Sequence, residues 1–167
     1  MALVVLGWRS REGEGRVRYR IYEEGDFDAL YAVEEICFAP PFRFGRAAMR
    51  RIVEEPKTAT WIAEDEEGMA GFAVVEWFRT RAGMSAYIQT IEVLTQKRGQ
   101  GAGQALLELM ERSAREAGAQ AIGLHVDAEN AGAIRLYERQ SYACDGRREG
   151  YYPQGGAALI YAKRLDG

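Results

Sequence analysis

A short glycine-rich segment constrains the fold of this chain more than any other feature. Residues 98–103 read Arg-Gly-Gln-Gly-Ala-Gly and follow an apolar, β-branched run that ends at Val93. Glycine has no Cβ and tolerates positive φ, so successive backbone N–H groups there approach a ligand closely. At the start of a helix such N–H groups are unpaired and lie at the positive end of the helix dipole, which favours a phosphate or pyrophosphate. The segment therefore predicts a strand, a phosphate-binding turn and a helix in succession.

Three phosphate-binding turns compete for this segment. A P-loop requires Lys and then Ser or Thr after its last glycine, where this chain has Gln104 and Ala105. A dinucleotide fingerprint requires Gly-x-Gly-x-x-Gly and a doubly wound sheet, but only about 40 residues follow Asp127, the candidate ribose-binding acid. The third turn, Arg/Gln-x-x-Gly-x-Gly, binds the pyrophosphate of coenzyme A, and residues 98–103 match it without a gap. A tight turn without a ligand is the remaining alternative, and the two adjacent cations disfavour it.

Hydrophobic periodicity predicts a single mixed α/β (α+β) sheet with helices on both faces. Alternating or β-branched runs indicate strands, apolar residues at helical spacing indicate helices, and Asp26 is expected to cap the first helix. The predicted order is β-α-α-β-β-β-α-β-α-β-β, with strands at 17–22, 58–63, 70–78, 85–93, 121–126, 142–148 and 157–164 and helices at 26–37, 45–55, 99–117 and 130–139. The central strand–helix–strand unit is expected to be parallel and right-handed, and the other strands antiparallel.

Length and composition limit the classes of protein to which the chain can belong. At 167 residues it is expected to form one domain, residues 17–167, after a poorly ordered tail at 1–16. The net charge of -3 excludes a strongly basic nucleic-acid binder. One histidine and two cysteines cannot form a metal cluster with ligand spacing, so no metal is expected. No apolar run is long enough to span a bilayer, and we expect a cytoplasmic monomer or homodimer without a membrane or nucleic-acid partner.

Together with a second segment, the turn resembles the cofactor site of the GNAT superfamily of acetyltransferases. The second segment, residues 124–137, reads Leu-His-Val-Asp-Ala-Glu-Asn-Ala-Gly-Ala-Ile-Arg-Leu-Tyr, and the resemblance extends over residues 17–165. Two shorter motifs resemble protein N-terminal acetyltransferases, including the ribosomal-protein-alanine type. Residues 38–42, Phe-Ala-Pro-Pro-Phe, are similar to a loop that lines the peptide groove in those enzymes. Residues 148–153, Arg-Glu-Gly-Tyr-Tyr-Pro, are similar to the paired-tyrosine loop on its other side.

The resemblance implies acetyl-CoA as cosubstrate and a sheet that is splayed at the cofactor site. Three strand residues before the turn would pair through their backbone with the pantetheine arm, and one of their N–H groups would be the oxyanion donor: Ile91, Glu92 and Val93. The turn would hold the pyrophosphate through Arg98, Gly99, Gln100, Gly101, Ala102 and Gly103. Asn130, at the start of the last helix, would bond the pantetheine arm.

The same resemblance assigns roles in acetyl transfer to three side chains. Tyr137 lies about two turns beyond Asn130 and resembles the tyrosine that donates a proton to the coenzyme A sulfur. His125 stands where the ribosomal-protein enzymes have glutamate, and strand alternation turns it away from its apolar neighbours. Some eukaryotic N-terminal acetyltransferases have histidine here and a tyrosine at the position of Tyr87. Tyr87 and His125 are therefore expected to deprotonate the amine through ordered water, the alternative being that His125 is structural.

We therefore expect transfer of an acetyl group from acetyl-CoA to a primary amine by direct attack in a ternary complex. The favoured acceptor is the α-amino group of a protein or peptide, bound by Phe42, Tyr151 and Tyr152. A small amine, such as a polyamine, amino acid or aminoglycoside, is the alternative acceptor. A non-catalytic coenzyme A-binding regulator is a third reading, against which the three side chains with roles in the transfer argue.

Overall fold

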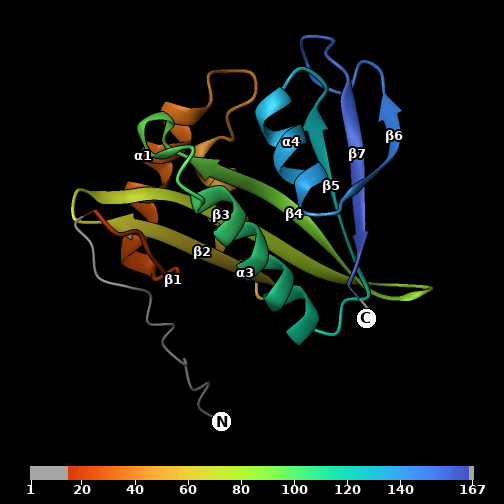
Figure 1. The fold of residues 1–167 in the computed structure, drawn as a ribbon, viewed down its shortest axis with the longest axis horizontal. Coiled ribbons are helices and arrows are strands. Elements are labelled where there is room, and N and C mark those ends of the chain that lie inside the picture. The colour runs from red at the N-terminus through yellow and green to blue at the C-terminus, as the bar shows by residue number, and fades with distance from the viewer. Residues whose placement is uncertain (1–14, 166–167) are drawn as a thin grey trace.

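The computed structural model describes residues 15–165 (Figure 1). The tail predicted at 1–16 lies outside these residues except for its last two positions. No helix in the described range is both long and apolar enough to cross a membrane. The elements follow in the predicted order, with two short 3-10 helices added: β1 Arg18–Ile21, η1 Glu24–Asp26, α1 Phe27–Cys37, α2 Arg46–Glu54, β2 Thr58–Asp65, β3 Gly68–Thr80, β4 Gly83–Val93, η2 Thr95–Lys97, α3 Ala102–Glu116, β5 Ala121–Asp127, α4 Ala131–Arg139, β6 Ala143–Arg148 and β7 Ala158–Arg164.

The strands form one open sheet in the order β1-β2-β3-β4-β5-β7-β6. β4 and β5 are parallel, whereas every other neighbouring pair is antiparallel. The parallel pairing covers only Ser85–Tyr87 opposite Ala121–Gly123, although β4 continues to Val93 and β5 to Asp127. Beyond Tyr87 the two strands diverge, and their backbone edges are open toward each other. The predicted mixed sheet and its splay are confirmed.

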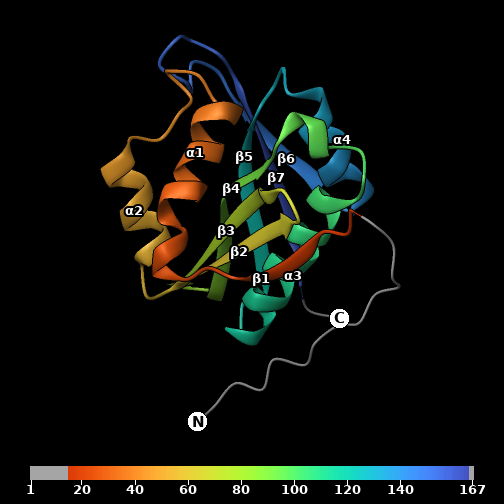
Figure 2. The same ribbon diagram turned by 90° about the vertical axis from the view of Figure 1, so that its left-hand side faces the viewer.

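Helices cover both faces of the sheet because successive strand residues pack into two different cores (Figure 2). In β2, Ile62 packs with α1 and α2, whereas its neighbours Trp61 and Ala63 pack with α3. Leu30 of α1 is fully buried in the first core and Leu106 of α3 in the second. α4 lies on the same side of the sheet as α3.

A β-bulge in β4 determines which side chains face each core near the opening. The pairing of β4 with β3 shifts register there, and Gln89 is an extra residue in β4. An extra residue reverses the alternation of the strand. Ile88 and Val93, five positions apart, accordingly both pack in the α3 core. Tyr87 and Glu92, also five positions apart, therefore both face the α1 side.

The helix after the glycine turn begins later than the sequence predicts. α3 starts at Ala102 rather than at Gly99, and η2 precedes the turn. Gly99 and Gly101 have φ values of 75° and 87°, in the left-handed region that a right-handed helix excludes. The predicted start at Gly99 is therefore wrong, because the turn uses the conformational freedom of two glycines before the helix begins.

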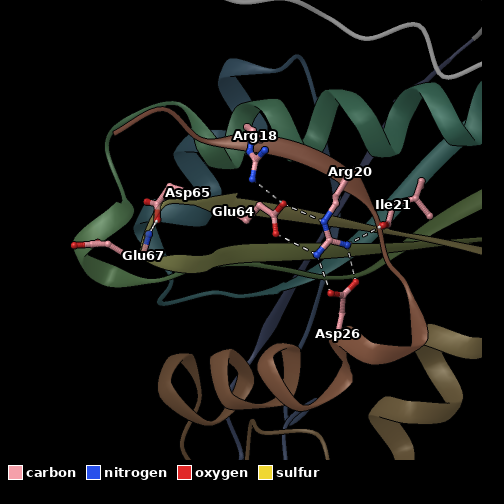
Figure 3. Close-up of polar contacts among 7 residues, drawn as sticks. All are labelled: Arg18, Arg20, Ile21, Asp26, Glu64, Asp65 and Glu67. Atoms are coloured by element: carbon pink, nitrogen blue, oxygen red, sulfur yellow. Dashed lines mark hydrogen bonds and ion pairs between the residues drawn. The ribbon is translucent and has the colours of Figure 1, made fainter. Parts of the chain in front are cut away.

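Ion pairs around Arg20 stabilise the β1 edge of the sheet (Figure 3). The other edge of the sheet is β6. The Arg20 guanidinium donates to the two carboxylate oxygens of Asp26 at 2.7 and 2.8 Å and to those of Glu64 at 3.1 Å. Asp26 precedes α1, but its carboxylate accepts from Arg20 and from the Glu23 N–H and caps no N–H of that helix. The predicted cap is therefore wrong, because the charged, bidentate arginine is the stronger partner.

Candidate active site

A cleft of about 740 Å³ lies where β4 and β5 diverge. Its volume falls within the ordinary range for small-molecule sites. Its walls are the end of β4, the glycine turn, the start of α3 and one side of α4, and the C-terminal end of α1 adjoins it. The structure brings eight of the predicted cofactor residues to this cleft: Ile91, Glu92, Val93, Arg98, Gly99, Gly101, Gly103 and Asn130.

The remaining two predicted cofactor residues do not line the cleft. Ala102 is buried in the α3 core, and Gln100 is exposed. Sequence reasoning missed Gln104 on α3 and the arginines of α4, Arg135 and Arg139, which do line it. The available signal was the spacing of Gly132, Arg135 and Arg139, which are three and four residues apart and therefore share one side of α4.

The turn presents unpaired backbone donors. No side chain caps α3, whose first bond runs from the Ala105 N–H to the Gly101 carbonyl at 3.0 Å. The preceding N–H groups, at residues 102–104, have no partner among the described residues. Arg98 Nε donates to the Val93 carbonyl at 2.8 Å and so ties the turn to the end of β4. This arrangement fits an anionic ligand such as a pyrophosphate.

The charges along the cleft also favour an anion. Arg98, Arg135 and Arg139 line it, and Glu92 is the only carboxyl among the described lining residues. Burial and a hydrogen bond with Glu34 raise the pKa of Glu92 to about 10, so this group is not a full negative charge at neutral pH. Among the described residues, the Arg139 guanidinium makes one hydrogen bond, from Nε to the Arg135 carbonyl at 3.3 Å. Its charge therefore remains available to a ligand.

Asn130 stands at the N-terminus of α4, where the helix meets the cleft. Its Oδ1 accepts from the Ala133 N–H at 3.1 Å and caps the helix. The cap uses the carbonyl side of the amide and leaves the NH₂ group as the donor for a ligand.

Tyr87 and His125 come together across the two diverging strands. Tyr87 Oη and His125 Nδ1 are 2.9 Å apart. His125 faces away from Leu124 and Val126, both buried in the α3 core, as alternation predicts. Burial lowers the pKa of His125, and the positive charge of Arg148 lowers it further. Burial raises the pKa of Tyr87, so both partners are neutral at neutral pH and the imidazole is free to accept a proton.

The three residues predicted to bind the acceptor substrate form a row that begins beside this pair. Tyr151 stacks on His125 with ring centroids 4.7 Å apart and planes 7° apart. Tyr152 meets Tyr151 edge-on at 5.0 Å and Phe42 at 5.0 Å. We name this continuous row, Phe42–Tyr152–Tyr151–His125, the aromatic bridge. It joins the α1–α2 loop to the β6–β7 loop.

Tyr137 is in the core rather than in the wall of the cleft. It is 4% exposed, and its ring packs against Tyr142 and Tyr161 at centroid distances of 5.7 and 6.3 Å. Burial raises the pKa of Tyr137, and interaction with the phenols of Tyr87 and Tyr152 raises it further. The Tyr137 hydroxyl therefore stays protonated at neutral pH, and the phenols of Tyr87 and Tyr152 are its electrostatic neighbours.

Comparison with known proteins identifies the family. Residues 22–142 match the family described as Acetyltransferase (GNAT) family. The uncharacterized N-acetyltransferase YdgE of Bacillus subtilis (strain 168) is 38% identical over 58 residues, which are 35% of this chain and 37% of that protein. The matched segment thus spans little more than a third of the relative.

Solved structures extend the similarity over nearly the whole chain. The ribosomal-protein-S18-alanine N-acetyltransferase from Escherichia coli is 26% identical with a TM-score of 0.78, covering 91% of this chain and 96% of that one. Arabidopsis thaliana NAA60 in complex with acetyl-CoA shares the fold at 23% identity and a TM-score of 0.79, covering 91% and 100%. The family match includes the diverging strands and the glycine turn. The chain belongs to the acetyltransferase (GNAT) family.

Proposed function

We propose that the protein transfers an acetyl group from acetyl-CoA to the α-amino group of a protein or peptide. The observation that carries this proposal is the aromatic bridge beside the Tyr87–His125 pair. It places a proton acceptor directly next to Tyr151, in a row of rings that two separate loops contribute. A similar fold occurs in the E. coli enzyme named for the alanine of ribosomal protein S18.

The donor half of the site fits acetyl-CoA. The unpaired N–H groups at 102–104 and the Arg98 charge suit the pyrophosphate, and Arg135 and Arg139 add positive charge across the cleft. The open edge of β4 offers backbone groups of residues 91–93 to the pantetheine arm, and the Asn130 NH₂ is a further donor. Acetyl-CoA supplies the activated thioester when bound, and the chain orients it.

The proton transfers follow from the states of three side chains. An ammonium has no lone pair, so the acceptor amine must lose a proton to attack. Neutral His125 takes that proton through ordered water, and its Nδ1–H then donates to Tyr87. The sulfur needs a proton as the new C–N bond forms and the C–S bond breaks. Tyr137, which is buried, protonated and directly follows Leu136 of the cleft wall, is the proposed source of that proton through water, and its phenolate regains the second proton that the nitrogen loses.

The bridge favours an extended chain over a compact amine as acceptor. Phe42 and Tyr152 meet from opposite loops, and Tyr151 covers one face of His125. Such rings present apolar surface and neighbouring backbone groups on both sides of an entering N-terminus. A small polar amine would use little of that surface.

A panel of acceptors with thiol release as the signal tests the proposal. Peptides with a free N-terminus should be acetylated, whereas N-terminally blocked copies, polyamines, amino acids and aminoglycosides should not. Tyr152→Ala should raise the KM for the peptide about tenfold through loss of aromatic contact, with the KM for acetyl-CoA unchanged. Turnover of small amines with free peptides left untouched would refute the peptide acceptor.

A further inference from the structure

Two buried carboxyl groups lie in contact beside the cleft without a role in the chemistry above. Glu34 of α1 has no exposed surface, and Glu92 of β4 is 3% exposed. The β4 bulge turns Glu92 toward α1, where its side chain lies close enough to that of Glu34 for a hydrogen bond once one of the two carboxyl groups is protonated. Neither carboxyl has an ion-pair partner within 4 Å in the described chain, so no cation compensates the pair.

Each of these carboxyl groups has one oxygen with a donor and one without. Thr90 Oγ1 donates to Glu92 Oε1 at 2.8 Å, and the Phe44 N–H donates to Glu34 Oε1 at 2.7 Å. The two Oε2 atoms are buried and have no hydrogen-bond partner among the described residues. Two ionised carboxylates here would repel each other and leave both Oε2 atoms unsatisfied. One proton between them removes both costs.

We propose that Glu34 and Glu92 share a single proton and that this acid pair is a positioning element, which fastens the α1–α2 loop to β4 at the cleft. The proton lies between the two Oε2 atoms, and the pair keeps one net negative charge. Neither glutamate contacts a substrate in this proposal; both affect the cleft through each other and through the position of the α1–α2 loop.

The acid pair holds the α1–α2 loop at Phe44. The Phe44 N–H donates to Glu34, and the Phe44 carbonyl accepts from Tyr31 Oη at 2.9 Å. Both backbone groups of Phe44 are therefore fixed, two positions after Phe42, the first ring of the aromatic bridge. The pair thereby sets where Phe42 stands relative to β4. The effect on acceptor binding rests on the proposed function, whereas the shared proton does not.

Substitution of Glu34 separates proton sharing from packing. In Glu34→Gln the amide oxygen can accept from the Phe44 N–H while its NH₂ donates to ionised Glu92, which preserves the net charge of the pair. Glu34→Leu keeps the volume but removes both bonds. Glu54→Leu, the same change at an exposed glutamate of α2, is the matched control.

The shared proton is detected by infrared spectroscopy at pH 7. Wild type should show the carbonyl band of a protonated carboxylic acid, and in Glu34→Gln this band should disappear at a lower pH than in wild type, because Glu92 then faces an amide donor in place of a carboxyl group. Absence of the band from wild type, or its disappearance at the same pH in both proteins, would refute the shared proton.

The fastening is measured by hydrogen exchange at the Phe44 amide and by steady-state kinetics. Phe44 exchange should be about tenfold faster in Glu34→Leu, the effect of losing one hydrogen bond to a carboxylate, and unchanged in Glu34→Gln and Glu54→Leu. In Glu34→Leu the KM for a peptide with a free N-terminus should also rise, whereas the KM for acetyl-CoA should stay within twofold of wild type. Equal Phe44 protection in Glu34→Leu and wild type would overturn the fastening role. If no peptide is turned over, the infrared and exchange results still decide the pair, and only the peptide acceptor fails.

Discussion

The hydroxyl of Tyr87 and Nδ1 of His125 lie 2.9 Å apart across the two strands whose divergence forms the cleft. Tyr87 is the last residue of β4 that pairs with β5, opposite Gly123, so the backbone holds both strands in register just before they separate. This side-chain contact therefore sits at the fixed end of the opening. The adjacent bulge lets β4 present Tyr87 and Glu92 on the same face.

Removing His125 should remove the acid limb of the pH profile along with most of the rate. Burial and Arg148 lower the pKa of His125, so wild-type kcat/KM should hold below pH 6.5 and fall as the pH drops through the lowered pKa. His125→Ala should lose about a hundredfold in kcat/KM and show no such limb. Tyr87→Phe should lose less, because the imidazole remains. Tyr19→Phe, a change on the β1 edge strand, serves as the control. A full rate with the limb intact in His125→Ala would mean that another group is the base.

Gly101→Ala should weaken acetyl-CoA binding, whereas Gly118→Ala should not. The two glycines have φ values of 87° and 86°, and a Cβ at either would meet no atom within 4 Å. Each substitution should therefore cost a similar stability, about 1 kcal/mol, through the backbone conformation alone. Only Gly101 lies in the cleft wall. Urea denaturation should show matched losses, and calorimetric titration should show about tenfold weaker binding for Gly101→Ala alone. Equal affinities would place the pyrophosphate elsewhere.

The sequence was sufficient for the order of elements because alternation and helical spacing are local properties. The strands that contain Ile62 and Leu124 are the clearest cases. Each of these two side chains packs in a core, and its neighbours in the sequence face the other side of the sheet. The glycine turn was placed correctly, but its conformation was not: the left-handed φ at Gly99 and Gly101 delays α3 in a way that composition alone does not reveal.

Long-range contacts account for what could not be predicted. Asp26 was expected to cap α1 but binds Arg20 and leaves the helix uncapped by side chains. Glu34 shares a helix face with Leu30, which indicates an inward position, yet glutamate is the residue type of a solvated face. Only the bulge at Gln89, which depends on pairing with β3, brings Glu92 to it.

Arg139→Gln should weaken acetyl-CoA binding by about fivefold at low salt, the value of a partly exposed charge pair. Arg139 lines the cleft on α4 and is not engaged by a carboxylate in the described chain, so its charge is free to meet a phosphate. The loss should shrink as salt rises, because screening removes the same attraction from wild type. Arg112→Gln, on α3 and outside the cleft wall, should bind as wild type. Titrations at two salt concentrations measure the effect, and an equal loss for both variants would show that net charge alone is responsible.

Glu92→Gln should flatten the dependence of stability on pH above neutrality. Burial, and then the hydrogen bond with Glu34, raise the pKa of Glu92 in the folded protein from 4.5 to about 10, so the folded state binds a proton that the unfolded state has released. Between these two pKa values the free energy of unfolding should therefore fall with rising pH, by up to about 1.4 kcal/mol per pH unit from this group. Glutamine cannot titrate, yet its NH₂ can donate to Glu34, so the variant should lack this slope and gain on wild type as the pH rises from 6 toward 10. Glu108→Gln, at an exposed position of α3, should keep the wild-type slope. Urea denaturation at intervals of pH supplies the measurement, and parallel curves for Glu92→Gln and wild type would show that Glu92 is ionised in the folded protein.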